Sequence, residues 1–320
     1  MLLFILSIAL KPTRNMNKFL ILIIFCLSHQ NTEAKKLYKY KDEHGRWYFS
    51  DNPPKTKQQV EVRQLKVTAK RHVWLEKTGD KQKPEYFVIN TYQGPVEIEV
   101  ALSQTENVHS NPELPNRFIV QPGQSDTLFQ VTGIDEFKSW RYSLEYRYTI
   151  GSPLAIHDVH AIYSLPFAKG SHYPVSQAFG GEFSHNDKQN QYAVDIVMPV
   201  GTPIYASRPG VAMEVDNDYF KNGTKKSYKS RANSIRILHV DGSMAIYAHL
   251  ALEKAQVYPG LKVSAGQLIG YSGNTGFSSG PHLHFAVQVN KGMELVSVPF
   301  EFMGIDGLAK APVAGSLLVN

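Results

Sequence analysis

The sequence predicts an all-β protein on three observations. Short runs in which apolar and polar residues alternate recur along most of the 320 residues, as in EYFVINTY, PVEIEVALS and SMAIYAHL. Such period-two alternation predicts half-buried strands. Turn-forming residues separate the runs, since the chain holds 23 Gly and 18 Pro. With 42% hydrophobic and 19% charged residues, the composition is that of a globular protein long enough for two or three domains.

Residues 1–34 are expected to form a secretory signal peptide. Lys18 provides a positive start, an apolar run covers residues 19–27, and the small residue Ala34 precedes two lysines. This is the pattern of a cleaved export signal. Because the run is too short to cross a bilayer as a permanent helix, we expect no stable membrane insertion after cleavage. An uncleaved anchor is the alternative.

The only cysteine, Cys26, lies inside this apolar run. A chain processed after residue 34 contains no thiol, and export without disulfides suits the periplasm or cell envelope of a Gram-negative bacterium. Either Met1 or Met16 is the true start. The formal net charge is +6 without a long basic run, so we expect no nucleic-acid partner. The sequence identifies no protein partner.

Residues 35–55 are expected to form a small β-hairpin module, and the polar residues 56–70 a linker. Two aromatic-rich alternating stretches flank DEHGR, and NPP ends the second, which is the pattern of a hairpin with a proline stop. The module resembles a short domain of unknown function common at the amino ends of exported proteobacterial proteins. This resemblance implies an envelope location. The matching residues are Tyr38, Lys39, Tyr40, Asp42, Gly45, Phe49, Ser50, Asp51, Pro53 and Pro54.

Residues 71–160 are expected to form a β-sandwich-like module. Alternating runs such as NRFIVQPGQSDTLFQV and WRYSLEYRYTI follow one another with Gly, Pro and Asn between them, which is typical of repeated short strands. His72 and His109 are isolated in this region. The default interpretation of the module is therefore a structural or binding role.

Residues 161–305 remain rich in strands and hold the informative histidines. His282 and His284 stand at alternate positions of the run PHLHFAVQV, so their side chains lie on one face of a strand. By itself, such a pair also fits a solvated face. Asp195 lies in the apolar run YAVDIVMP, where an unpaired carboxylate is costly and a cation is expected. With His185 in a preceding loop, these are residues of the kinds that bind catalytic zinc.

The same region resembles the lysostaphin-like, or LytM-type, zinc metalloendopeptidases, which cut peptidoglycan peptides. The resemblance covers roughly residues 161–303. It rests on four segments in order, AFGGEFSHN, YAVDIVMPVGTPIYASRPGVA, YAHL and VSAGQLIGYSGNTGFSSGPHLHF, and an ordered set is more specific than any one motif. We expect a mostly antiparallel catalytic sheet whose groove is floored by one zinc ion.

The resemblance implies a role for five residues. His185 and Asp195 correspond to the metal ligands of the family's first motif, and His284 corresponds to the third ligand. His249 of YAHL and His282 correspond to the two catalytic histidines that do not bind the metal. They would act as general base and as donor to the oxyanion, in either order. The separation of His185 from Asp195 is longer than in many members, which leaves the shape of that loop open.

The expected function is that of an exported zinc-dependent endopeptidase that hydrolyses peptide bonds in peptidoglycan stems or cross-bridges. The substrate follows from the resemblance alone. The alternative is a non-catalytic peptidoglycan-binding protein or an activator of a cell-wall amidase, but the complete ligand set favours the enzyme. A purely structural zinc is disfavoured because such sites take four protein ligands.

Three segments outside these motifs also carry expectations. Residues 182–191 and 217–233 are expected to wall the groove, although the basic stretch at 221–231 fits a solvated insertion better than a binding surface. The apolar tail at 306–320 has no assigned role.

The run HVDGSMAIYAHL predicts a hairpin about Asp241 and Gly242. His239 lies beside that hairpin. It is expected to be structural, with contact to residues around the zinc site as the alternative.

Overall fold

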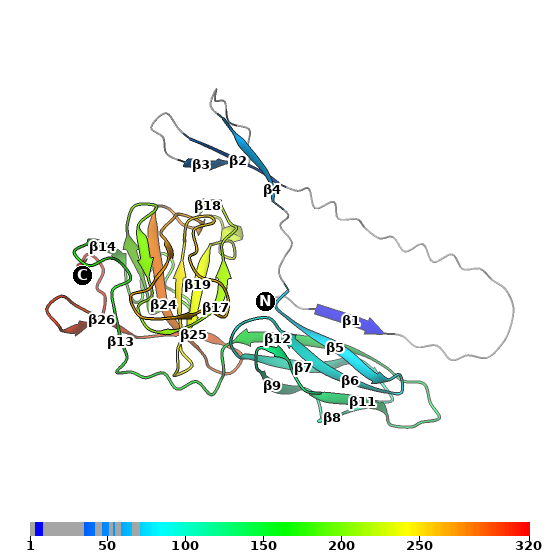
Figure 1. Ribbon diagram of the computed structural model, residues 1–320. Coiled ribbons are helices and arrows are strands. Elements are labelled where there is room, and N and C mark those ends of the chain that lie inside the picture. Colours follow the sequence, from blue (N-terminus) through cyan, green and yellow to red (C-terminus); the bar gives the residue numbers. More distant parts are fainter. Residues whose placement is uncertain (1–3, 9–34, 42–46, 51–53, 55–58, 66–70) are drawn as a thin grey trace. The chain divides into compact units, whose positions relative to one another are not determined.

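The computed structural model describes residues 4–8, 35–41, 47–50, 54, 59–65 and 71–320 (Figure 1). The fold is all-β, as expected, because the one helical element among these residues is the 3-10 turn η1 (Lys226–Tyr228). In this part of the chain no helix has the length and apolar character needed to cross a membrane. The expected signal peptide lies outside the described residues, apart from strand β1 (Phe4–Ile8).

The described residues within 35–71 belong to a unit of their own. Its described strands are β2 (Lys35–Lys41), β3 (Trp47–Ser50) and β4 (Glu61–Leu65), in the antiparallel order β3-β2-β4. Strands β2 and β3 pair as the expected hairpin requires. Strand β4, however, lies where we expected a linker. Glu61 Oε2 of β4 lies 3.5 Å from Lys39 Nζ of β2, and such charged residues are common on edge strands. This explains the linker-like composition.

The second region consists of two sheets that share one hydrophobic cluster, which agrees with the expected sandwich. One sheet has the order β1-β12-β7-β9, and the other has the order β10-β6-β11-β8 with β5 beside β6. Alternate residues of the facing strands point inward, so Ile98 of one sheet and Tyr86 and Phe129 of the other are buried together. The strands are β5 (Val73–Asp80), β6 (Lys83–Asn90), β7 (Val96–Glu106), β8 (Val108–Asn111), β9 (Asn116–Val120), β10 (Gly123–Gln124), β11 (Phe129–Gly133) and β12 (Arg141–Ile150).

The third region is built on a nine-stranded sheet of order β21-β17-β19-β20-β24-β15-β14-β28, with β25 also pairing with β24. All its strand pairs are antiparallel, which confirms the expected sheet. Its strands are β14 (His172–Gln177), β15 (Ala193–Val197), β17 (Gly210–Asp216), β19 (Ser234–Leu238), β20 (Met244–Ala248), β21 (Lys262–Val263), β24 (His282–Asn290), β25 (Leu295–Val298) and β28 (Leu317–Val319).

Three small sheets accompany the large one. They contain β13 (Ile162–Tyr163), β26 (Glu301–Met303) and β27 (Ala309–Lys310); β16 (Pro203–Tyr205) and β22 (Leu268–Tyr271); and β18 (Asn222–Gly223) and β23 (Gly276–Phe277).

The segment 306–320 is more than a tail, because it supplies two of these strands. Strand β28 pairs with β14, with Leu318 opposite Tyr173. Leu318 is partly buried against the main hydrophobic cluster. Strand β28 pairs with β14, which lies far away in the sequence. The apolar residues of 306–320 therefore did not predict this pairing by themselves.

The two faces of the large sheet differ in polarity, and this difference positions the site. Along the central strand β24, Leu283, Phe285 and Val287 point into the hydrophobic cluster, while His282 and His284 occupy the alternate positions. Burial of one side chain such as Phe285 stabilises the fold by about 1.5 to 3 kcal/mol. Burial of the apolar side chains therefore fixes the strands, and with them the positions of the polar side chains on the opposite face.

The turn of the β19–β20 hairpin lies at Asp241 and Gly242, as expected, and Gly242 has a φ of +81° that favours glycine. Nearby, His239 is only 3% exposed. Its Nδ1 lies 2.8 Å from the carbonyl oxygen of Pro209 and donates to it. Burial lowers the pKa of His239 to about 4.

We expect His239 to make stability depend on pH. Because its pKa falls from 6.5 to about 4 on folding, the unfolded chain binds the proton more strongly. The contribution of His239 to the free energy of unfolding is therefore fully present above pH 6.5. It decreases by about 3 kcal/mol as the pH falls toward and below 4. Denaturant unfolding of His239→Asn, which keeps a side-chain N–H donor, should show a weaker pH dependence than the wild type. The exposed His160→Asn should match the wild type, and identical profiles for all three proteins would contradict the assignment.

Candidate metal centre

Asp195 and His284 face each other across two neighbouring strands. In the antiparallel pairing of β15 with β24, Asp195 stands opposite His284, and Val197 stands opposite His282. Directly opposed residues point to the same face of a sheet. His284 Nδ1 consequently lies 2.9 Å from Asp195 Oδ1.

His185 reaches the same carboxylate from the loop between β14 and β15. It is fully buried, and its Nε2 lies 3.2 Å from Asp195 Oδ1. Its Nδ1 donates to the carbonyl oxygen of Ala178 at 2.9 Å. The loop passes close to β14 at Gly181, where a Cβ would lie 2.1 Å from Gln177 Cγ. The long separation from His185 to Asp195 thus takes the form of a loop that folds back over the sheet.

The environment of His185 fits a bound cation. A carbonyl oxygen only accepts hydrogen bonds, so Nδ1 carries the proton of the neutral imidazole and Nε2 carries a lone pair. Nε2 is buried without a hydrogen bond although it faces the Asp195 carboxylate. Two lone pairs repel at this distance unless a proton or a cation lies between them.

The ligand atoms of His185, Asp195 and His284 all lie within 4.8 Å of one another, and no other such group of His, Cys, Asp or Glu occurs among the described residues. Burial disfavours the Asp195 carboxylate, but the imidazoles of His185 and His284 more than offset this and hold its pKa well below the ordinary value. Two imidazoles and an ionised carboxylate are typical zinc ligands, and three ligands leave one position open.

His249 and His282 lie beside this group, with ring centroids 4.6 Å apart. His249 Nδ1 donates to Thr275 O at 2.6 Å, and His282 Nδ1 donates to Gly280 O at 2.8 Å. In both neutral rings Nε2 is therefore unprotonated. Burial and the neighbouring His282 and His284 lower the pKa of His249 to about 3, and burial also lowers the pKa of His282.

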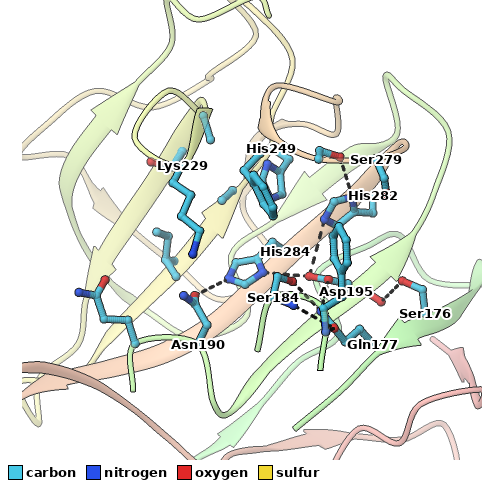
Figure 2. A pocket seen from close by; sticks show the side chains of 18 of the residues that line it. Ser176, Gln177, Ser184, Asn190, Asp195, Lys229, His249, Ser279, His282 and His284 are labelled. Atoms are coloured by element: carbon cyan, nitrogen blue, oxygen red, sulfur yellow. Dashed lines mark hydrogen bonds and ion pairs between the residues drawn. The ribbon is translucent and has the colours of Figure 1, made fainter. Parts of the chain in front are cut away.

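The backbone at His249 is unusual. This residue has a φ of +63° directly after strand β20, a conformation that is uncommon outside glycine and that clusters at functional sites. The centroid of the His249 ring lies 5.8 Å from the centroid of the His284 ring. Figure 2 shows the imidazoles of His249, His282 and His284 close to the Asp195 carboxylate.

A groove of about 720 Å³ contains these side chains. Phe183, Asp187 and Asn190 line it from the loop at 182–191, and Lys229 lines it from the loop at 217–233, so both loops wall the groove as expected. Lys229 Nζ lies 4.0 Å from Asp187 Oδ2. The basic stretch therefore contributes to the groove and is not only a solvated insertion.

Two polar residues that support the site had no recognisable signal in the sequence. Gln177 Nε2 donates to Asp195 Oδ2 at 3.0 Å and to Ser184 Oγ at 2.7 Å. Asn190 Oδ1 accepts from His284 Nε2 at 3.1 Å. Both contacts depend on the return of the loop to the sheet, which spacing in the sequence does not reveal. His239 does not line the groove, in agreement with its expected structural role.

Two segments of the chain match known families. Residues 189–295, which include Asp195, His249, His282 and His284, match Peptidase family M23. The chain carries an M23 peptidase domain. Residues 25–71 match a domain of unknown function (DUF4124), and this span includes strand β4. Both resemblances expected from the motifs are thus confirmed.

The M23 relatives include enzymes of several bacteria. The chain is 41% identical over 95 residues to the peptidoglycan DD-endopeptidase ShyA of Vibrio cholerae. The matched segment is 30% of this chain and 19% of that protein. It is 39% identical over 102 residues to the glycyl-glycine endopeptidase ALE-1 of Staphylococcus capitis. Here the matched segment is 32% of this chain and 25% of that protein. The chain therefore spans a quarter or less of the length of these two curated relatives.

Among solved structures, the catalytic domain of lysostaphin from Staphylococcus simulans is 35% identical. The match covers 39% of this chain and 81% of that chain, with a TM-score of 0.26.

Zinc binding should separate the five residues into two groups. If His185, Asp195 and His284 hold zinc, His185→Ala, Asp195→Ala and His284→Ala should each lose it on purification. His249→Ala and His282→Ala should keep about one zinc per chain, which elemental analysis after dialysis measures. Retention of zinc by the His185 and His284 variants would contradict the ligand assignment.

Gln177→Ala should weaken zinc binding without removing a ligand. The amide of Gln177 orients the Asp195 carboxylate and the His185 loop together, and loss of such a support lowers metal affinity by roughly 10- to 100-fold. Competition with a chelating dye measures the effect. Gln124→Ala, which makes the same change at an exposed position of β10, is the matched control and should retain the wild-type affinity.

Proposed function

We propose that the protein is an exported zinc-dependent endopeptidase that hydrolyses peptide bonds in peptidoglycan stems or cross-bridges. The observation that carries the proposal is the complete group of His185, Asp195 and His284, of which Asp195 and His284 line a groove together with His249 and His282. A protein that only bound peptidoglycan would have no need for a three-ligand metal group with two further imidazoles beside it.

In this proposal His185, Asp195 and His284 would hold the zinc ion. When bound, zinc supplies a Lewis acid that polarises the scissile carbonyl and makes water a better nucleophile at neutral pH. The carbonyl oxygens of Ala178, Thr275 and Gly280 orient the imidazoles of His185, His249 and His282.

His249 and His282 are the residues that would move protons. Each presents an unprotonated Nε2, because its Nδ1–H is committed to a backbone carbonyl. One of them would accept a proton from the attacking water at Nε2, and the other would donate a hydrogen bond to the developing oxyanion once its own Nε2 carries a proton. Their lowered pKa values keep both rings neutral at neutral pH before the substrate reacts.

The substrate class rests on the relatives. ShyA is a peptidoglycan DD-endopeptidase, and ALE-1 is a glycyl-glycine endopeptidase. The groove of this chain is lined by acidic, basic and amide side chains, including Glu214, Arg236 and Gln288. Such a lining suits an extended peptide with many hydrogen-bonding groups. Location in the periplasm or cell envelope is supported by the signal-like pattern of residues 1–34.

The test is the release of new amino groups from purified sacculi, identified by mass spectrometry of the muropeptides. We expect the wild type to cleave, a chelator to abolish cleavage, and zinc to restore it. Cleavage that persists in the zinc-free protein would contradict the proposal. Absence of any cleavage by the zinc-loaded protein would favour a binding protein or an activator of an amidase.

His249→Ala and His282→Ala should each lower kcat by roughly 10²- to 10⁴-fold, the range typical of a lost general acid or base, while zinc content stays at the wild-type value. The exposed His172→Ala is the matched control and should leave kcat unchanged. A wild-type kcat in both active-site variants would contradict their assigned roles.

A further inference from the structure

The sandwich is fixed against the end of the catalytic sheet. Glu97 of β7 is 4% exposed, and its Oε2 accepts from Asn290 Nδ2 at 2.9 Å and from the Met293 backbone N–H at 2.6 Å. Met213 and Met244 of the catalytic sheet pack into the hydrophobic cluster of the sandwich. Buried apolar contacts together with a charge-assisted hydrogen bond make a firm junction.

A hollow of about 330 Å³ lies at this junction. Strand β12 of the sandwich lines one side with residues 147–150, and the turn between β24 and β25 lines another side with residues 293–295. Gln189 of the groove-walling loop completes the lining. Thr149 stands opposite Glu97 in the pairing of β12 with β7, so it belongs to the end of the sandwich that meets the sheet.

The hollow and the groove of the metal site adjoin each other. Gln189 lines both of them. Gln189 thus connects the wall of the groove to the hollow beside the sandwich.

We propose that this hollow is a second part of the substrate cleft, in which the sandwich binds the peptide chain at a distance from the scissile bond. The proposal rests on the proposed function. The lining suits a peptide that carries both charges, because the Arg147 side chain is 39% exposed and that of Glu294 is 50% exposed. Arg147 uses Nε and Nη2 for Glu99, which leaves further N–H groups for a carboxylate or an amide.

This role gives the sandwich a function in catalysis that no motif within it indicates. A peptide held at both ends loses freedom before the reaction, so remote contacts favour long substrates over short ones. The sandwich would therefore select cross-linked fragments over single stems.

The experiment compares the zinc-loaded full chain on two substrates, a monomeric muropeptide and a cross-linked dimeric muropeptide. Thr149→Trp fills the hollow, and we expect it to raise KM for the dimer about tenfold, with kcat and the KM for the monomer unchanged. Thr105→Trp is the matched control, because Thr105 is exposed at the other end of β7, roughly 25 Å from Glu97 along the strand. It should leave all constants unchanged.

Glu294→Ala is a second variant, which removes only an exposed ion pair with Lys188 and should cost little stability. It should raise KM for the dimer severalfold, whereas Glu106→Ala, which breaks the exposed pair with Arg141, should not. If Thr149→Trp and Glu294→Ala fold normally and match their controls on the dimer, the second subsite does not exist. If the zinc-loaded wild type cleaves neither muropeptide, the proposed function itself fails.

Discussion

The register that sets Asp195 opposite His284 is the constraint on which the candidate site depends. A shift of one residue between β15 and β24 would turn one of the two side chains into the hydrophobic cluster. Leu283 and Phe285 on one strand and Val194 and Ile196 on the other prevent this, because they are buried on the opposite face. The packing of the apolar face thus determines which polar groups meet on the other.

The buried carboxylate of Asp195 requires nearby groups that offset the free-energy cost of removing its charge from water. Asp195 is 7% exposed, and an uncompensated charge in such a place is strongly destabilising. The imidazoles and the amide of Gln177 supply part of that compensation, and a bound cation would supply more. The backbone conformation of His249 and the carbonyl partners of the histidines show that the surrounding chain orients the rings.

The large sheet also links the site to the rest of the chain. Its polar face carries the groove with Arg236 and Glu214 in its lining, while Met213 and Met244 pack into the hydrophobic cluster of the sandwich. The walls of the groove come from loops that are distant in sequence, at 182–191 and 217–233. One sheet therefore brings together the candidate metal group, the groove and the neighbouring module.

The sequence by itself determined the all-β class, the strand faces and the five residues that we propose for the site, because alternation along a strand and ordered motifs are local properties. The tertiary structure alone decided the pairing of β4 and β28, the supporting contacts of Gln177 and Asn190, and the place of Lys229 in the groove. Each of these depends on which distant segment lies alongside. Pairing between segments far apart in the chain depends on the packing of the whole fold, so no local pattern records it.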